Sequence, residues 1–211
     1  MTDHDPFDSN ATDTKTIIMQ ATLETLHEYG YAGLSMSRIA DEAEISKSSL
    51  YHHYNDKDDL LYEFLQRIIT QLENDFALVE FDDPVTALER LLVQGIQGQD
   101  PPTASNPVIE HVSPDDTDLD QTHNTYIELR AQAVHDDEYR EKITELDQTL
   151  KQHIETIIEA GIEQDDFRDV NVGAVSQTLL TLVLGSITHR ATSNDTDLAE
   201  VQTVVRSCMN Q

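Results

Sequence analysis

Apolar residues recur three or four positions apart along most of this 211-residue chain, and no segment shows the strict alternation that is typical of a β-strand. Residues 136–161 show the helical spacing most clearly, in the series Tyr139, Ile143, Leu146, Leu150, Ile154 and Ile157. Glycine (7) and proline (6) are both scarce, whereas a sandwich or barrel needs a turn about every 8–12 residues. The sequence therefore predicts an all-α fold class.

The bounds of the expected helices follow from this spacing and from the breaks between segments. Residues 1–12 carry no apolar period, and we expect them to be disordered. Residues 99–119 hold four of the six prolines and are expected to form a loop that is either functional or disordered. The expected helices span residues 13–29, 35–44, 46–54, 56–79, 83–98, 120–134, 136–161, 172–192 and 197–209.

The charge balance is strongly acidic. Thirteen Lys and Arg residues face 41 Asp and Glu residues, which gives a formal net charge of -28. A folded protein with this charge repels itself in dilute buffer, and salt relieves the repulsion because the screening length falls to about 3 Å at 1 M. We therefore expect a halophilic protein, from a cytoplasm with a high salt concentration.

Cysteine content and apolar runs indicate the compartment. A single cysteine, Cys208, excludes an internal disulfide framework. Residues 1–13 are acidic and polar, unlike a signal peptide. The longest apolar run, near residues 179–187, is shorter than the roughly 20 residues that span a bilayer. These features predict a soluble, cytoplasmic protein without a membrane partner.

The most informative stretch is residues 34–61, which predicts two short helices joined by a tight turn. On the first helix, Ile39, Ala40 and Ala43 share one face. Ser35 precedes this helix and can cap it by accepting a hydrogen bond from a free backbone N–H. The helix can therefore pack its apolar face against the rest of the domain.

The second helix of the pair has small and hydrogen-bonding residues on its outer face. Ser46 is the expected N-cap, and Leu50 and Tyr54 point inward. The outward residues are Ser48, Ser49, His52 and His53, with Tyr51 at the border. Small serines allow the backbone to approach a DNA major groove, where histidine and tyrosine side chains can contact base edges or phosphates. This arrangement is typical of a helix-turn-helix.

Lys57 gives a separate indication. Asp56 is the expected N-cap of the long helix that follows, so Lys57 lies in the first turn, where the helix dipole favours anions over cations. A DNA phosphate at this helix start would explain the lysine, because the free backbone N–H groups and the ammonium would both face an anion. The alternative is an ordinary surface lysine.

The segment ISKSSLYHHYNDKDDLL, residues 45–61, resembles the DNA-binding domain of the TetR/AcrR family of one-component regulators. The resemblance covers some 45 residues when the first helix is included. Residues 127–143 are similar to a stretch between two later helices of these regulators, and the last two expected helices resemble the pair that forms the dimer interface.

This resemblance implies a division of the chain into three parts. Residues 1–12 would form a disordered N-terminus, residues 13–55 the TetR-type helix-turn-helix domain, and residues 56–211 an effector-binding and dimerisation domain. Residues of about 171–209 would join two copies as a homodimer. The dimer would bind double-stranded DNA at a palindromic operator, and an unknown small amphipathic effector would release it.

The resemblance also implies roles for individual residues. Lys57 would hold a phosphate, and Ser37 and Arg38 would contact the DNA backbone or bases from the first short helix. From the recognition helix, the resemblance implies that five residues meet DNA: Lys47, Ser48, Ser49, Tyr51 and His53. The outward position of His52 adds it to this set. No catalytic residue and no cofactor is implied.

Two features depart from the family pattern. Glu44 occupies the turn position that is usually glycine, and a non-glycine residue in a left-handed conformation costs roughly 1 kcal/mol. The turn is therefore either slightly strained or differently shaped. Residues 10–60 contain four basic and nine acidic residues, a balance of -5, although DNA-binding domains are usually basic. In molar salt, affinity must then come from short-range contacts and from two half-sites bound together.

The remaining candidate sites are a metal site and an effector pocket. No His pair has i, i+3 or i, i+4 spacing, so the nine histidines indicate surface or groove-facing groups and no metal site. Eight residues could line an effector pocket or could equally be ordinary core: Leu88, Leu92, Ile96, Tyr126, Leu129, Arg130, Ile143 and Leu146. The rival functional classes are a non-sensing architectural DNA-binding dimer and a helical enzyme with an appended three-helix N-terminus.

Overall fold

The computed structural model of the chain describes residues 6–77, 83–93 and 119–193, and every regular element in these ranges is a helix. The predicted all-α class is confirmed. The predicted helix at residues 197–209 lies outside the described residues, as does the predicted loop up to residue 118. The helices are α1 (Pro6–Gly33), α2 (Met36–Glu42), α3 (Lys47–His53), α4 (Lys57–Ala77), α5 (Pro84–Leu92), α7 (Leu119–Gln132), α8 (Asp137–Glu163) and α9 (Val172–Thr192).

Helix α1 begins earlier than expected. The prediction of disorder for residues 1–12 is wrong for residues 6–12, which form the first turns of α1. Proline is tolerated at a first helical position because its fixed φ suits a helix and the missing N–H has no helical partner there. The absence of an apolar stripe hid this segment from the periodicity argument, since such a stripe reports packing and not helix formation itself.

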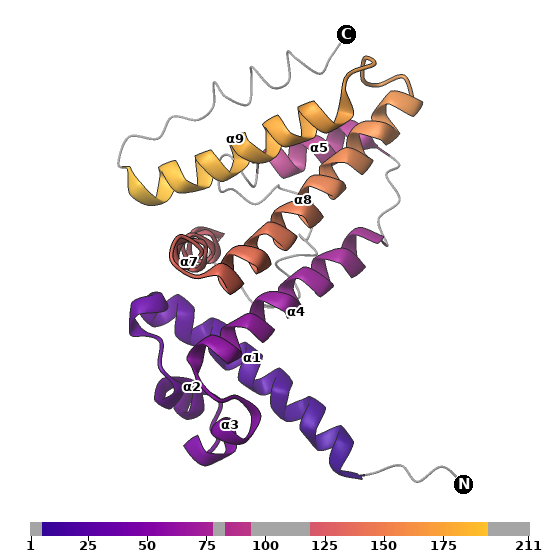
Figure 1. The fold of residues 1–211 in the computed structure, drawn as a ribbon. Helices are drawn as coiled ribbons and strands as arrows, with labels where there is room; N and C mark the ends of the chain where they lie inside the picture. Colours follow the sequence, from indigo (N-terminus) through magenta and orange to yellow (C-terminus); the bar gives the residue numbers. More distant parts are fainter. Residues whose placement is uncertain (1–5, 78–82, 94–118, 194–211) are drawn as a thin grey trace, which may run out of the picture.

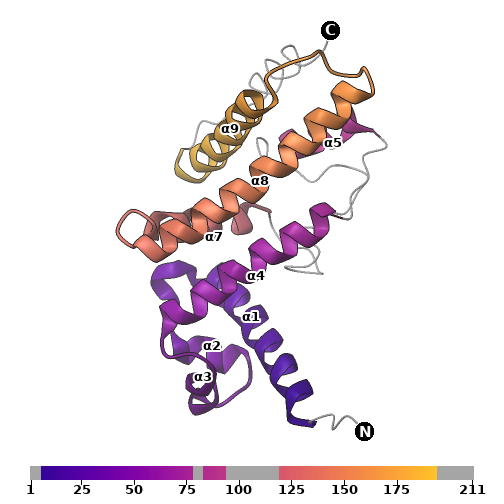
Figure 2. The same ribbon diagram turned by 45° about the vertical axis from the view of Figure 1, so that its right-hand side comes forward.

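The helices are arranged around α8, which contacts α4 on one side and α5, α7 and α9 on others. Figures 1 and 2 show α4 and α8 running side by side, with α9 and α5 beyond α8 and with α1, α2 and α3 gathered at the start of α4. The N-terminal helices therefore lie at one end of the molecule, and α7 lies between α1 and α9, contacting both.

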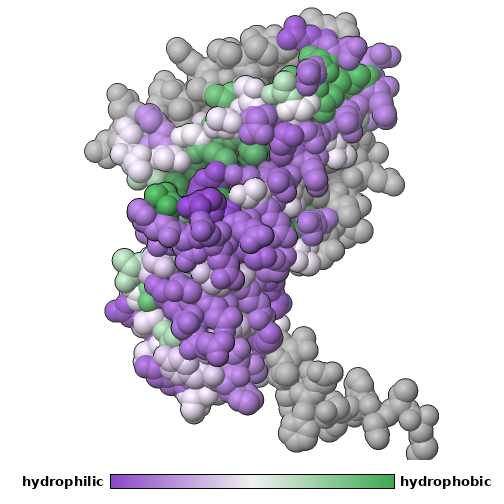
Figure 3. All heavy atoms as spheres, in the orientation of Figure 1, coloured by the Kyte–Doolittle hydropathy of each residue, from purple (hydrophilic) through white to green (hydrophobic). Residues whose placement is uncertain are grey.

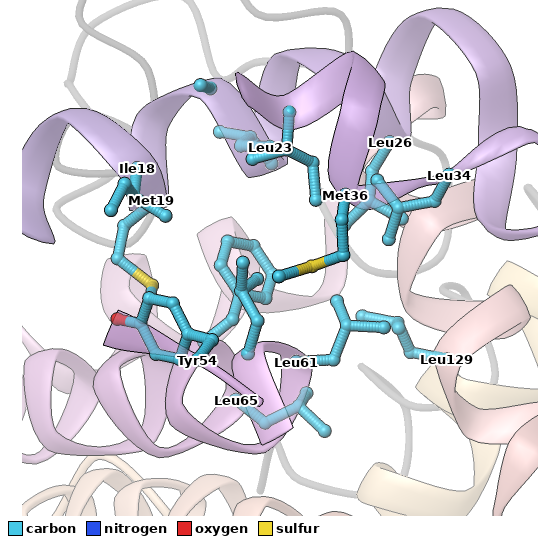
Figure 4. Packing of buried hydrophobic residues seen from close by; sticks show 14 of the residues in the cluster. Ile18, Met19, Leu23, Leu26, Leu34, Met36, Tyr54, Leu61, Leu65 and Leu129 are labelled. Atoms are coloured by element: carbon cyan, nitrogen blue, oxygen red, sulfur yellow. The ribbon is translucent and has the colours of Figure 1, made fainter. Parts of the chain in front are cut away.

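The first apolar cluster joins the two predicted domains. Met36 of α2 and Leu61 of α4 lie in the same cluster as Leu129 of α7, and Figure 4 shows these side chains close together. Tyr139 and Ile143 of α8 also belong to it. The packing is therefore continuous across residues 55 and 56, and α7 and α8 share one apolar cluster with the helix-turn-helix.

A second cluster packs α5 and α9 onto α8. Leu88 and Leu92 of α5 are buried against Ile157 of α8 and Leu179 of α9. By length and composition alone, α9 could cross a membrane, because its apolar window has a mean hydropathy of 1.3. Only 28% of that window is buried within the described chain, so much of the helix is left uncovered. Figure 3 shows hydrophobic surface gathered in this half of the molecule on the face displayed.

A histidine on α8 makes folding sensitive to mild acid. Burial lowers the pKa of His153 to about 4, below its ordinary value of 6.5. Between these values the unfolded chain binds the proton more readily, so stability falls as the pH drops from 6.5 to 4 and this contribution is constant below. We expect a loss of about 3 kcal/mol across this interval. Urea unfolding at pH 7 and pH 4.5 measures it.

The variant His153→Leu should lose this part of the pH dependence, whereas His52→Gln, at an exposed position of α3, should retain it. Other titrating groups affect all three proteins alike, so the difference between variants isolates His153. Equal acid sensitivity of His153→Leu and the wild type would contradict the prediction.

Candidate nucleic-acid interface

Serine caps fix the starts of the two short helices, as predicted. The Ser35 hydroxyl accepts a hydrogen bond from the backbone N–H of Arg38 at 3.3 Å, and α2 begins directly after it. The Ser46 hydroxyl accepts from the backbone N–H of Ser49 at 3.1 Å, at the start of α3. Each cap satisfies one of the backbone donors that a helix start leaves free. The start of each helix is therefore encoded locally.

The inward faces of both helices are also as predicted. Ile39 of α2 and Leu50 of α3 are completely buried in the first cluster, and Tyr54 is 2% exposed. Figure 4 shows the Tyr54 ring lying against Met19 of α1. Glu44 in the turn has a φ of 52°, so this non-glycine residue adopts the left-handed conformation, which is the strained one of the two alternatives. The turn therefore keeps its shape at some cost in backbone strain.

The outward face of α3 is accessible along its length. Lys47, Ser48 and His52 are exposed, and Tyr51 has 48% of its surface exposed although it is a large aromatic residue. Ser49 and His53 are half-buried at the borders, and the His53 ring lies 5.8 Å from that of His52. Such an exposed tyrosine contributes little to the core, which leaves it available for a base or a phosphate.

Arg38 and its neighbour Ser37 are both exposed on α2, but the Arg38 side chain is held against α1. The guanidinium carbon of Arg38 stands 4.4 Å from the centroid of the Tyr29 ring, and the same group donates a hydrogen bond to the carbonyl of Gly33. Tyr29 and Gly33 both belong to the end of α1. Arg38 therefore ties α2 to α1, and its predicted contact with DNA would require the side chain to leave this position.

Lys57 is the first residue of α4, as expected. The Asp56 carboxylate caps this helix by accepting from the backbone N–H of Asp59 at 2.9 Å. The Lys57 ammonium lies 3.8 Å from the centroid of the Tyr31 ring, within cation–π range. The side chain is thus held at a defined place beside the end of α1, and this partner was not foreseen from the sequence because residues 31 and 57 are far apart.

Several carboxylates lie close together where α2 packs against α1. The pKa of Glu42 on α2 is raised by a hydrogen bond with Glu24, by partial desolvation and by the charges of Glu24, Glu28 and Glu44. A raised carboxyl pKa of this origin shows that the ionised groups repel one another. Contact between the helix-turn-helix and a polyanion therefore requires either screening by salt or an approach from the α3 side.

The structure does not bring together the eight residues predicted to line an effector pocket. Leu88 and Leu92 are buried in the second cluster, whereas Leu129 and Ile143 are buried in the first. Leu146 packs in a third, smaller cluster. These five serve as core, which was the alternative interpretation of the same apolar stripes, and Ile96 lies outside the described residues.

A groove of about 720 Å³ lies instead between α8 and α9, with Arg130 of α7 at its edge. Arg130 binds Asp147 through two hydrogen bonds of 2.8 Å and also donates to the Tyr126 hydroxyl. Burial raises the pKa of Tyr126, so its phenol stays protonated. The sequence does contain an indication of this groove that was missed: polar residues recur four positions apart on the otherwise apolar α9. The groove residues are Arg130, Thr144, Asp147, Gln148, Lys151, Gln177, Leu180, Thr181, Leu184, Gly185, Thr188, His189 and Thr192.

Within the part of the chain that the structure describes, no three His, Cys, Asp or Glu side chains gather closely enough to hold a metal ion.

Comparison with protein families gives two matches in different parts of the chain. Residues 18–64 match the family described as bacterial regulatory proteins of the tetR family. Residues 103–210, about half of the chain, match the family described as the C-terminal part of BetI-type transcriptional repressors. The first match covers the helix-turn-helix, and the second covers α7, α8 and α9.

Individual relatives agree with these matches. The HTH-type transcriptional regulator UidR of Escherichia coli K12 is 33% identical over 84 residues, which is 40% of this chain and 40% of UidR. The crystal structure of a TetR transcription regulator from Haloarcula marismortui covers 95% of this chain and 100% of that one, with a TM-score of 0.73 and 28% identity. A putative transcriptional regulator from Saccharomonospora viridis, solved in complex with choline, shares the fold with a TM-score of 0.70, 16% identity and coverage of 95% and 99%.

Proposed function

Because the chain belongs to the TetR family of transcriptional regulators, we propose that it works in the cytoplasm as a homodimer that binds a palindromic operator in double-stranded DNA. Bound there, the dimer represses transcription by occlusion, and a small amphipathic effector releases it. The observation that carries this proposal is the outward face of α3, which presents polar and aromatic side chains while Leu50 and Tyr54 anchor the helix from behind.

The side chains divide into two kinds of contact. Lys47, Tyr51 and His52 have the reach and the exposure to meet base edges or phosphates in the major groove. Lys57 supplies a charge for a phosphate at the start of α4. Ser48 and Ser49 are short, so they let the α3 backbone come close to the groove wall, and His53 lies at the edge of this surface.

Dimerisation through α9 accounts for the uncovered surface of that helix. The residues on its exposed side lie at the spacing of successive helical turns: Gln177, Thr181, Gly185 and Thr188. They also line the groove between α8 and α9, so a partner helix packed there would cover that groove. These residues are small or uncharged, so a second helix can approach closely. Two α3 helices in such a dimer would enter successive major grooves about 34–36 Å apart.

Replacing Gly185 with arginine tests the α9 interface. A Cβ atom at Gly185 would meet nothing within 4 Å, so the variant should fold as a monomer without clashes. We expect dimerisation to weaken by at least about 100-fold, because an unpaired charge would be forced into the interface. Sedimentation equilibrium measures this change. Gln20→Arg, on an exposed position of α1, is the matched control, and a dimeric Gly185→Arg protein would contradict the assignment of the interface.

The groove between α8 and α9 is the proposed place for the effector. It combines two leucines with hydroxyl, amide and charged groups, which suits a molecule with an apolar body and a polar end. The Saccharomonospora viridis relative holds choline, which makes small organic cations a reasonable first set of compounds to test by thermal shift. A rise in melting temperature with one compound class would identify the chemistry of the effector.

Capture of genomic DNA by the purified protein in molar KCl, followed by sequencing, tests the function as a whole. We expect enrichment of a short palindrome near promoters. An architectural DNA-binding dimer would enrich no sequence, and an enzyme would enrich no DNA, so either outcome would refute the proposal.

A further inference from the structure

The end of α1 contains a break that a residue from another helix completes. Gly30 has a φ of 63° and a ψ of 178°, which interrupts the helix and starts a last short turn at Tyr31. Residues other than glycine rarely adopt this φ. A Cβ on Gly30 would also lie only 2.9 Å from a carboxylate oxygen of Glu128. The backbone conformation therefore favours glycine at this position, and a Cβ there would push the Glu128 carboxylate away.

Glu128 of α7 supplies the acceptor that the new turn needs. Its Oε2 accepts a hydrogen bond from the backbone N–H of Tyr31. The first N–H groups of a helical turn have no partner within the turn, and a carboxylate there is also favoured by the local dipole. Glu128 thus caps the last turn of α1 from a helix 97 residues away in the sequence.

The same tyrosine holds the lysine proposed to contact a phosphate. The Tyr31 ring lies under the Lys57 ammonium at 3.8 Å, and the edge of the Tyr139 ring of α8 packs near it with centroids 6.5 Å apart. Tyr31 therefore connects two contacts: its backbone is bound by Glu128, and its ring sets where the Lys57 charge lies.

The side of α7 that faces away from the end of α1 borders the groove between α8 and α9. Glu128 and Arg130 are two residues apart, so their side chains leave the helix about 200° from each other around its axis. Glu128 faces the end of α1, and Arg130 lines the groove between α8 and α9. A displacement of α7 by a molecule in the groove would therefore move the cap of Tyr31.

We infer that Glu128 is a positioning residue for DNA binding, which acts through Tyr31 to hold Lys57 at its phosphate and which links α7 to that contact. This inference rests on the proposed function, because it assigns Lys57 to a phosphate of the operator. Glu128 itself does not contact DNA.

Two variants that remove the same charge separate this role from general electrostatics. Glu128→Gln keeps an oxygen that can accept from Tyr31, whereas Glu128→Ala does not. We expect Glu128→Ala to weaken binding of the captured operator by about fivefold, the size of effect expected for losing one typical hydrogen bond. We expect Glu128→Gln to bind close to the wild type. Simple removal of a negative charge would strengthen DNA binding in both variants.

The salt dependence of operator binding tests whether the Glu128 variants act through the phosphate contact of Lys57. Loss of one phosphate contact makes the slope of log K against log [KCl] shallower by about 0.9 per protomer. We expect this change in Glu128→Ala and in Lys57→Met, and we expect no further change when the two are combined. Tyr31→Leu, which removes the ring and keeps the backbone N–H, should behave like Glu128→Ala and serves if that variant does not fold.

Additive losses in the double variant, an unchanged salt slope, or equal weakening by Glu128→Gln and Glu128→Ala would overturn the inference while leaving the proposed function intact. A wild-type protein that selects no DNA sequence would instead overturn the proposed function and the inference together. Titration by fluorescence anisotropy at several KCl concentrations gives all of these quantities.

Discussion

Replacement of Tyr51 with alanine should abolish specific operator binding and leave a folded dimer. Tyr51 is 48% exposed on the outer face of α3, so its removal takes little from the core. Each protomer of the dimer would lose a groove contact, and losses of about 1–3 kcal/mol at each of the two half-sites add up to a weakening of roughly 30-fold or more. Binding to the captured operator and to a scrambled duplex, measured side by side, gives the specific part of the change.

A matched control separates this loss from a general effect of trimming a surface residue. Val134, in the turn between α7 and α8, is 66% exposed and also apolar, and Val134→Ala should bind the operator as the wild type does. Both variants should keep the wild-type melting temperature within a few degrees. Normal operator affinity of Tyr51→Ala would refute the assignment of α3 as the recognition helix.

Stability should rise steeply with KCl concentration, which is the second large effect that we expect. The net charge of -28 is compressed into a small volume, and the raised pKa of Glu42 shows that carboxylates on α1 and α2 repel one another. Between 0.1 M and 1 M salt the screening length falls from about 10 Å to about 3 Å. If this relieves about 3 kcal/mol of repulsion, the melting temperature of a domain of this size rises by roughly 10 °C.

The salt series needs a control for exclusion of solutes from the protein surface, which also stabilises folded proteins. A sucrose series of equal osmolality supplies it, because sucrose is excluded without screening charge. We expect KCl to raise the melting temperature much more than sucrose does. Maximal stability in dilute buffer would contradict the expectation of a protein adapted to high salt.

Features that depend on neighbouring residues could be predicted from the sequence. Ser35, Ser46 and Asp56 were identified as caps because an N-cap needs only its own side chain and the next turn of backbone. The inward positions of Leu50 and Tyr54 followed from helical spacing alone. These local rules were sufficient to predict the helix-turn-helix and the accessible face of α3.

Features that depend on contacts between distant segments could not be predicted. Two such contacts are made by Tyr31: its ring packs against the Lys57 ammonium, and its backbone N–H is capped by Glu128. No local sequence pattern links these three residues. The groove proposed for the effector could not be located from the sequence for a related reason, because an apolar stripe does not reveal whether it faces a core or a cavity. Arg130 was the one predicted pocket residue that the described structure places at the groove.

The central claim is that the outer face of α3 enters the major groove, and a DNA-cleaving iron chelate attached to that face tests it most directly. With Cys208, the sole cysteine, replaced by serine, Ser48→Cys carries the chelate on α3 and Gln152→Cys carries it on an exposed position of α8. The account predicts that the Ser48 label cleaves the operator at two positions related by its symmetry, about 34–36 Å apart, and that the Gln152 label cleaves neither. Equal cleavage from the two positions, or none from Ser48 with the operator fully bound, would contradict it.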